Sequence, residues 1–350
     1  MADEIIRILS VDGGGIRGII PARILQRIEE GTEKHAIDLF HLIAGTSTGG
    51  IIGCGLLKGK TAAELAQLYA DRGGEIFHRS LWDKVTTIDG LSNPDYDAGP
   101  LENILGEELG DTWLSERKDT ELLVPSYAIQ LPFEQPGDGL GSLVPRAPYF
   151  FKSWKARGVD LDPGEKSEEL DFRLRDIARA TSAAPTYFPP ASIKNRADQS
   201  FGMIDGGVFA NNPAMCALVA AYKLFPGKKF MMVSLATGSL ERPIPYDEAK
   251  NWGLVHWARP ILNVLFDGNA DTTSYEVNQI LGASYYRFDI SLGMTPRQDP
   301  NAVNEDFDDA SPDNIARMER KADALANGMA AKLQSVIGEL KKPKWAAGTV

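Results

Sequence analysis

A serine-centred motif is the first place in this chain where residue types and spacing could support chemistry. Ser47 lies in Gly-Thr-Ser-Thr-Gly, the G-x-S-x-G spacing of a nucleophile elbow. An apolar run at 41–45 precedes it and a glycine-rich helical stretch at 48–59 follows, which predicts a strand, a sharp turn and a helix. Gly45 and Gly49 are expected there because the strand and the helix crowd one another. The pattern predicts Ser47 as a nucleophile that attacks an acyl carbonyl.

A serine hydroxyl is a weak nucleophile, so an adjacent base must take its proton. The usual base is histidine, and the chain has four histidines: His35, His41, His78 and His256. His41 begins the strand that leads to Ser47, and His35 lies in a connection from a helix to a strand. His256 has the chain order of a Ser–Asp–His triad but falls in a helical, aromatic stretch. These positions do not favour a histidine base.

A carboxylate is the alternative base. Asp205 ends the expected strand at 200–205 and is followed by Gly206 and Gly207, which let another backbone segment approach. Functional side chains collect at the carboxyl ends of strands in an open parallel sheet. A dry site raises the proton affinity of a carboxylate. We therefore expect Asp205 to serve as the base, although an ordinary turn-forming aspartate would fit these residues equally well.

Three consecutive glycines follow the first apolar run, at a place where glycine is costly unless something approaches the backbone closely. Gly13, Gly15 and Gly18 match the G-x-G-x-x-G dinucleotide fingerprint. A dinucleotide site also needs an acidic residue near the end of the second strand, where this chain has Ser47 instead. The alternative is an oxyanion hole, in which the N–H groups of Gly13, Gly14 and Gly15 stabilise the negative oxygen of a tetrahedral intermediate.

Nearby Arg17 either adds positive potential to this loop or braces it, and the sequence leaves both roles open. The aromatic-proline turn Tyr187, Phe188 and Pro189 is similarly ambiguous. Its side chains would either line an acyl groove or pack in the core beneath the site.

The elements that must position these residues alternate between strands and helices. That order predicts an α/β fold with three layers, helix, sheet and helix, around a mostly parallel central sheet. We expect strands at 5–11, 41–45, within 121–131, and at 200–205, 229–238 and 284–292. Helices are expected at 21–31 (ending at Gly31), 48–59, 61–73, 100–110, from 174, from Pro213, over most of 250–282, and as one closing helix at 312–340. No linker or repeat divides the chain, so 1–350 reads as one domain with a core at about 5–240 and a mainly helical extension beyond it.

Composition excludes several classes of function. The 350 residues include 37 basic and 48 acidic side chains, for a net charge of −11, which argues against nucleic-acid binding and against adhesion to anionic lipid by charge alone. The uncharged run at 40–57 contains too many glycines and a turn for a membrane span, and the acidic N-terminus does not resemble a signal peptide. We therefore expect a cytoplasmic protein. Cys54 and Cys216 read as small buried hydrophobes.

Two further segments carry weaker signals. The stretch at 130–148 has four prolines and three glycines, and reads either as a surface excursion or as a lid over the site. The acidic run at 304–309 lacks the ligand spacing of a metal site and reads as a solvated loop.

Three motifs in this order resemble the patatin-like phospholipase family: Asp-Gly-Gly-Gly-Ile-Arg-Gly at 12–18, the serine elbow, and Asp-Gly-Gly at 205–207. The resemblance covers about 5–240, and 180–190 and 233–238 are similar to plant patatins. It implies a Ser47–Asp205 dyad, an acyl-enzyme intermediate, an oxyanion hole in the glycine loop, no metal or cofactor, and hydrolysis of fatty acyl esters of membrane phospholipids or glycolipids with peripheral membrane contact.

Two alternatives remain at this stage. A soluble carboxylesterase or thioesterase would use the same dyad. A non-enzymatic nucleotide-binding or storage protein would keep the fold without turnover.

Overall fold

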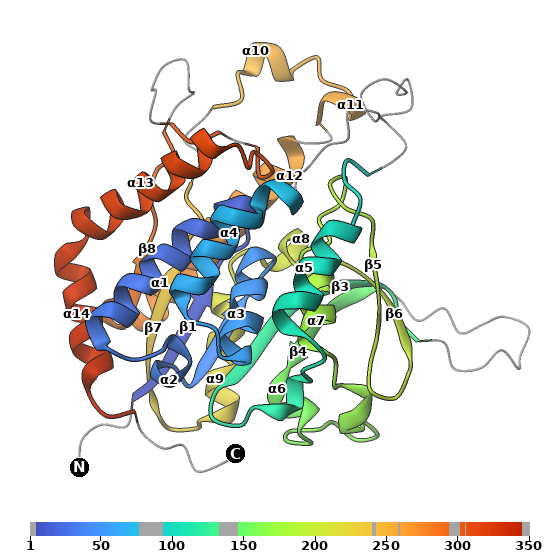
Figure 1. The fold of residues 1–350 in the computed structure, drawn as a ribbon, viewed down its shortest axis with the longest axis vertical. Coiled ribbons are helices and arrows are strands. Elements are labelled where there is room, and N and C mark those ends of the chain that lie inside the picture. The colour runs from blue at the N-terminus through green and yellow to red at the C-terminus, as the bar shows by residue number, and fades with distance from the viewer. Residues whose placement is uncertain are drawn as a thin grey trace, which may run out of the picture.

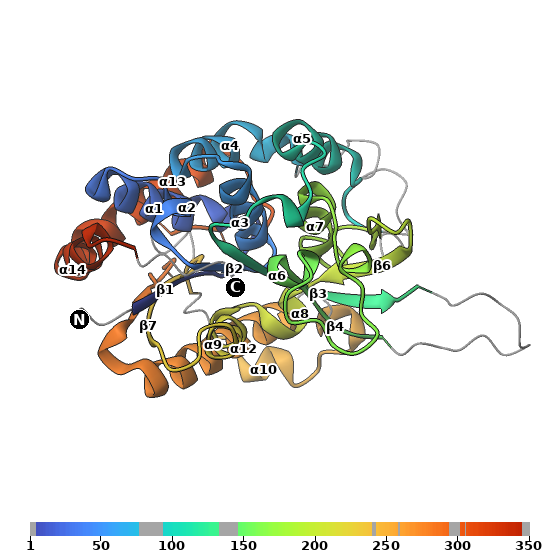
Figure 2. The ribbon, with the colours of Figure 1, turned by 90° about the horizontal axis from the view of Figure 1, so that it is seen from below.

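The computed structural model describes residues 5–76, 94–132, 146–239, 243–257, 260–293, 302–304 and 306–344. An eight-stranded sheet forms its centre, in the order β5-β6-β3-β2-β1-β7-β8, with β4 also paired to β3. Figure 2 shows α1, α3, α4, α5 and α13 on one face of the sheet, and α9 and α12 on the other. The expected three-layer α/β/α architecture is confirmed.

The parallel half of the sheet is built around β1 (Ile5–Val11), which pairs with β2 (Leu42–Gly45) and with β7 (Lys229–Leu235). β8 (Tyr285–Phe288) adds a parallel edge strand to β7. The late edge strand expected within 284–292 is therefore present, and the region beyond 240 extends the sheet as well as adding helices (Figure 1).

The other half of the sheet is antiparallel. β3 (Glu121–Gln130) pairs in parallel with β2 but antiparallel with β4 (Ala147–Lys152) and β6 (Ser200–Asp205). β5 (Ala191–Lys194) completes this edge, antiparallel to β6. The sequence analysis predicted neither β4 nor β5. Apolar and polar residues do not alternate regularly along β4, and β5 is short and directly follows two prolines. Most of the loop expected at 130–148 lies outside the described residues.

The helices carry the bounds that follow. They are α1 (Ile19–Thr32), α2 (Ala36–Leu39), α3 (Thr48–Lys58), α4 (Ala62–Ile76), α5 (Gly99–Leu109), α6 (Ser153–Ala156), α7 (Leu174–Thr181), α8 (Gly207–Ala210), α9 (Ala214–Leu224), α10 (Tyr246–Ala249), α11 (Leu254–Trp257), α12 (Pro260–Leu281), α13 (Pro312–Gly328) and α14 (Ala330–Lys341), with short 3-10 turns η1 (Gly15–Gly18), η2 (Leu114–Glu116), η3 (Ser167–Glu169) and η4 (Gly282–Ser284). Among the described helices, none combines the length and the apolar character needed to cross a bilayer.

Two helix predictions were wrong in an informative way. Gly31 does not end α1, which continues to Thr32; a Cβ atom at Gly31 would collide with Ile337 of α14. The closing helix is broken at Met329 into α13 and α14. Gly31 is therefore small because α14 packs closely against it, a contact that only the folded chain contains.

Apolar side chains fill both faces of the sheet. Along β1, Leu9 and Val11 join the core cluster under α1 and α3, while Ile6 and Ile8 join the cluster under α9. This alternation buries both faces of β1, as expected for a central parallel strand. The glycine loop that follows β1 therefore extends from a strand that is buried on both faces.

Candidate active site

Ser47 sits on a strained turn between β2 and α3. Its backbone has φ 53° and ψ −120°, a conformation that costs a non-glycine residue on the order of 1–3 kcal/mol. The Ser47 N–H donates to the Thr181 hydroxyl at 2.9 Å, which helps to hold the turn. A Cβ atom at Gly45 would collide with the Gly49 carbonyl, so both glycines are required by the close approach of strand and helix. The strand, turn and helix predicted around Ser47 are present.

Two strands that run toward each other bring Asp205 to Ser47. Leu123 of β3 pairs with β2 on one edge and β4 on the other, and Ser126 of β3 pairs with β6 and β4. β2 and β6 therefore lie along the same edge of β3. Because β2 is parallel and β6 antiparallel to β3, their carboxyl ends face each other. Asp205 does end a strand, as expected, but an antiparallel one.

Asp205 is buried, with 1% of its surface exposed. Its Oδ1 accepts the Gly207 N–H at 2.7 Å, and Ser47 lines the same cavity as this carboxylate. Burial raises the pKa of Asp205 from 3.8 to about 7, against the opposing effects of the Gly207 N–H and the nearby Ser47 hydroxyl. A Cβ atom at Gly206 would collide with the Pro125 carbonyl, so this glycine lets β3 approach. A carboxyl with a pKa near neutrality is suited to accept a proton.

The described histidines lie elsewhere. His35 and His256 are exposed, and His41 is buried with its Nδ1 accepting the Arg7 N–H at 2.9 Å. His78 lies outside the described residues. In the described part of the chain, no histidine lines the cavity at Ser47.

The glycine loop presents two of its three predicted donors to the cavity. The Gly13 N–H donates to the Asn211 carbonyl at 3.0 Å, so it is already occupied. Gly14 and Gly15 line the cavity beside Ser47, and among the described residues neither N–H donates a backbone hydrogen bond. Gly15 has φ 57°, which favours glycine, and a side chain there would also collide with the Phe307 carbonyl.

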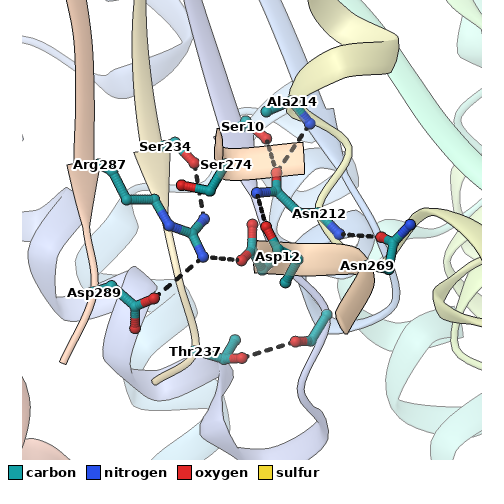
Figure 3. A network of polar contacts seen from close by, with 12 residues as sticks. Ser10, Asp12, Asn212, Ala214, Ser234, Thr237, Asn269, Ser274, Arg287 and Asp289 are labelled. Atoms are coloured by element: carbon teal, nitrogen blue, oxygen red, sulfur yellow. Dashed lines mark hydrogen bonds and ion pairs between the residues drawn. The ribbon is translucent and has the colours of Figure 1, made fainter. Parts of the chain in front are cut away.

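A polar network supports the loop from behind (Figure 3). The Thr237 hydroxyl donates to the Gly13 carbonyl at 2.7 Å. Asp12, which precedes the loop, lies 2.7 Å from Arg287 of β8, and Arg287 also donates to the Ser234 hydroxyl at 2.9 Å. Burial raises the pKa of Asp12 to about 6, although Arg287 opposes this shift. No local pattern in the sequence points to Arg287, because its partner is 275 positions away in the chain and the pairing exists only in the folded sheet.

Asn212 ties the same network to α12. Its Oδ1 accepts the Ala214 N–H at 3.0 Å, and its own N–H donates to Asn269 at 3.4 Å. The α12 helix is thus fixed against the segment that follows Asp205 (Figure 3).

Arg17 lies on the far side of the loop from Ser47. It is 1% exposed, and its guanidinium carbon lies 3.9 Å from the centroid of the Phe307 ring. It lines the polar cavity behind the loop and not the cavity at Ser47. Of the two roles left open by the sequence, this position favours bracing the loop.

The cavity at Ser47 has a volume of about 60 Å³. Tyr187 and Phe188 line it, whereas Pro189 does not; the Pro189 carbonyl instead accepts the Arg179 Nη2 at 2.8 Å. Its remaining apolar lining includes side chains that the sequence did not single out: Ile51, Tyr69, Ile76, Leu101, Phe266 and Phe307. They come from separate segments and share no local motif. The enclosed volume fits a reacting ester group but not a long acyl chain.

Over the described residues, no group of three or more His, Cys, Asp or Glu side chains is arranged to hold a metal ion. The acidic run at 304–309 is described in part, and its Asp308 carboxylate accepts a hydrogen bond from the Tyr96 hydroxyl at 2.5 Å.

Comparisons with known proteins identify a family for this chain. The model of the patatin-like phospholipase family matches residues 9–218. The chain is 30% identical over 328 residues to patatin-like protein 4 of Arabidopsis thaliana, which covers 82% of this chain and 76% of that protein. It is 29% identical over 348 residues to the probable inactive patatin-3-Kuras 1 of Solanum tuberosum, covering 89% and 84% of the two chains.

Among solved structures, human GIVD cytosolic phospholipase A2 superposes with a TM-score of 0.45 at 12% identity, over 96% of this chain and 60% of that chain. VipD from Legionella pneumophila superposes with a TM-score of 0.39 at 12% identity, over 92% and 67%. The matched family range holds the glycine loop, Ser47 and Asp205. The chain therefore belongs to the patatin-like phospholipase family.

Proposed function

We propose that this protein is a lipid acyl hydrolase of the phospholipase A type that works through a Ser47–Asp205 dyad. The observation that carries the proposal is that Ser47 and the buried Asp205 carboxylate, whose pKa burial raises to about 7, line one cavity together with Gly14 and Gly15. Membership in the patatin-like phospholipase family supports lipid acyl esters as the substrate class.

The reaction begins when the ester carbonyl enters the cavity. Asp205 takes the hydroxyl proton while Ser47 Oγ forms a bond to the carbonyl carbon, and the carbonyl oxygen becomes negative. The N–H groups of Gly14 and Gly15 stabilise this oxyanion; donors of this kind each contribute on the order of 3 kcal/mol in acyl transfer. The Gly13 N–H contributes indirectly, because its bond to Asn211 fixes the loop.

The tetrahedral intermediate collapses when the bond to the leaving oxygen breaks. That oxygen takes the proton from Asp205 and departs as the alcohol, which leaves the acyl group on Ser47. Asp205 then accepts a proton from water, the resulting hydroxide attacks the acyl-enzyme, and the fatty acid leaves as Ser47 regains its proton. Asp205 is a carboxylate again at the end of both acylation and deacylation, so the same residue serves as the base in each.

The narrow cavity gives a specific reason to consider a second activity. About 60 Å³ suits a short acyl group without rearrangement, which favours a soluble carboxylesterase or thioesterase with the same dyad. For a long-chain substrate, the aromatic side chains Phe266 and Phe307 must move apart on binding. Turnover of phospholipid and galactolipid vesicles, compared with short-chain esters, separates these two activities.

Labelling with a fluorophosphonate probe tests the serine mechanism. We expect the wild type to be labelled and Ser47→Ala to be unlabelled. Ser182 offers a matched control, since it lines the same cavity but its hydroxyl donates to the Ala178 carbonyl at 2.7 Å; Ser182→Ala should still be labelled. An unlabelled wild type would instead favour a non-enzymatic role, such as that implied by the relative named as probably inactive.

A further inference from the structure

A second cavity shares no lining residue with the cavity at Ser47. It has a volume of about 310 Å³ and lies between the β3–β4 pair and α9. Leu123, Trp154 and Leu224 form part of its wall and belong to the core cluster under α9. This volume is at the lower end of the roughly 300–1,000 Å³ that small-molecule sites occupy.

The wall of this cavity is apolar apart from one end. Its apolar lining includes Leu123, Phe150, Trp154, Met215, Cys216 and Val219, and its charged residues are Lys152, Lys223 and Asp160. The Lys223 ammonium is paired with Asp160 at 2.8 Å. Lys152 thus remains the cation available to a ligand.

The Lys152 ammonium makes no hydrogen bond and no ion pair with any part of the chain that the structure describes. It lies 5.5 Å from the centroid of the Phe150 ring. Burial lowers the pKa of Lys152, and the positive charges of Lys155 and Lys223 lower it further, whereas Asp160 and Glu165 oppose this shift. An anion bound in the cavity would give this half-buried ammonium a charge-assisted hydrogen bond.

An apolar cavity with one unpaired cation at its edge matches an amphiphile with a single anionic head. We propose that this cavity binds an unesterified long-chain fatty acid, with its carboxylate on Lys152 and its chain against Trp154. The volume favours one chain over the two of a diacyl lipid. The proposal draws on the proposed function in one respect, because that reaction would release this ligand.

Binding is tested in the Ser47→Ala variant, so that no turnover is needed and failure of the proposed function does not affect the result. The probe is stearate brominated along its chain, since bromine quenches tryptophan emission on contact. We expect saturable quenching, which Trp154→Phe should largely remove. Calorimetry with unlabelled stearate should show that Trp154→Phe still binds, and stearate methyl ester should fail to bind this site.

Two variants test the charge. Lys152→Gln removes the cation, and we expect a roughly tenfold to hundredfold weaker affinity, as for the loss of a charged hydrogen bond. Lys194→Gln is the matched control, because Lys194 of β5 is an exposed lysine that pairs with Asp198 at 2.8 Å. The affinity of this variant for stearate should match that of the parent. Val219 is 60% exposed at the rim, so Val219→Asp should fold normally and also weaken binding by repulsion.

The proposal fails if Trp154 emission is not quenched in the Ser47→Ala parent. It also fails if Lys152→Gln and Val219→Asp both bind stearate as tightly as that parent, which would show that the charge at this cavity does not contribute to binding. Equal binding of the methyl ester would show that the chain fills the apolar cavity without recognition of its carboxylate. That result would also overturn the proposal.

Discussion

Arg287 of β8 lies 2.7 Å from the Asp12 carboxylate, and both side chains are largely buried. Asp12 follows β1 directly and leads into the glycine loop, whereas Arg287 belongs to the part of the chain beyond the matched family range of 9–218. A lone negative charge at Asp12 would oppose an oxyanion at Gly14 and Gly15. The late strand therefore neutralises a buried charge at the start of the glycine loop.

Breaking this pair should be costly. Arg287→Met leaves Asp12 buried without its partner, and we expect a loss of about 3–5 kcal/mol in unfolding free energy, together with a lower kcat at little-changed KM. Urea unfolding and ester kinetics measure both effects. The double variant Asp12→Asn with Arg287→Met should recover much of the stability. Arg27→Met, which breaks an exposed pair with Asp323, is the control and should cost at most about 1 kcal/mol.

Thr237 offers a finer test of the loop's support. Its hydroxyl donates to the Gly13 carbonyl, and Thr237→Val removes this bond at nearly constant shape. A hydrogen bond of this kind is worth about 1 kcal/mol, so we expect kcat to fall roughly fivefold if its loss displaces the oxyanion donors. Thr237→Ser keeps the hydroxyl and should stay near wild type. Equal kcat values in the Val and Ser variants would show that this contact does not position the loop.

The pH dependence of activity should report Asp205. The base must be a carboxylate, so activity should rise with pH and level off above the raised pKa of about 7. The logarithm of kcat/KM against pH should therefore bend near 7 in the wild type, and Asp205→Asn should lose turnover. His256→Gln should keep the wild-type profile, because His256 is exposed on α11. A His256→Gln variant as inactive as Ser47→Ala would contradict the assignment of Asp205 as base.

The same carboxyl should make stability depend on pH. Its pKa is 3.8 in its ordinary state and about 7 in the fold, so between about pH 4 and pH 7 the folded protein binds more protons than the unfolded chain. Stability from this group is thus greatest at low pH and declines as pH rises through that window. Asp205→Asn removes this decline, so its melting temperature should exceed that of the wild type increasingly toward pH 8. A constant difference across pH would rule out the titration of Asp205.

Phe266 should limit acyl-chain length. It lines the cavity from α12, and its ring centroid lies 5.8 Å from that of Phe307. We expect Phe266→Ala to raise kcat/KM for lauroyl esters relative to butyryl esters, because it widens the cavity. Tyr275→Ala changes an exposed residue of the same helix and should leave the ratio unchanged. An unaltered ratio in Phe266→Ala would place the acyl chain elsewhere.

Local patterns in the sequence were enough for the serine elbow and for the helix expected from 61. At the start of α4, the Thr61 N–H donates to Glu64 at 2.7 Å and the Glu64 N–H donates to the Thr61 hydroxyl at 3.1 Å, an exchange within four residues. The sequence reading failed at Gly31, because its close neighbour Ile337 is remote in the chain.

The sequence by itself determined which residue types stand at the strand ends, because buried strands, glycine turns and capped helices follow from steric and hydrophobic preferences within a few neighbouring residues. Only the tertiary structure decided that β2 and β6 meet end to end on β3, that the Gly13 N–H is occupied by Asn211, and that Arg287 faces Asp12. These relationships depend on pairing between residues at least 72 positions apart, which no local preference encodes.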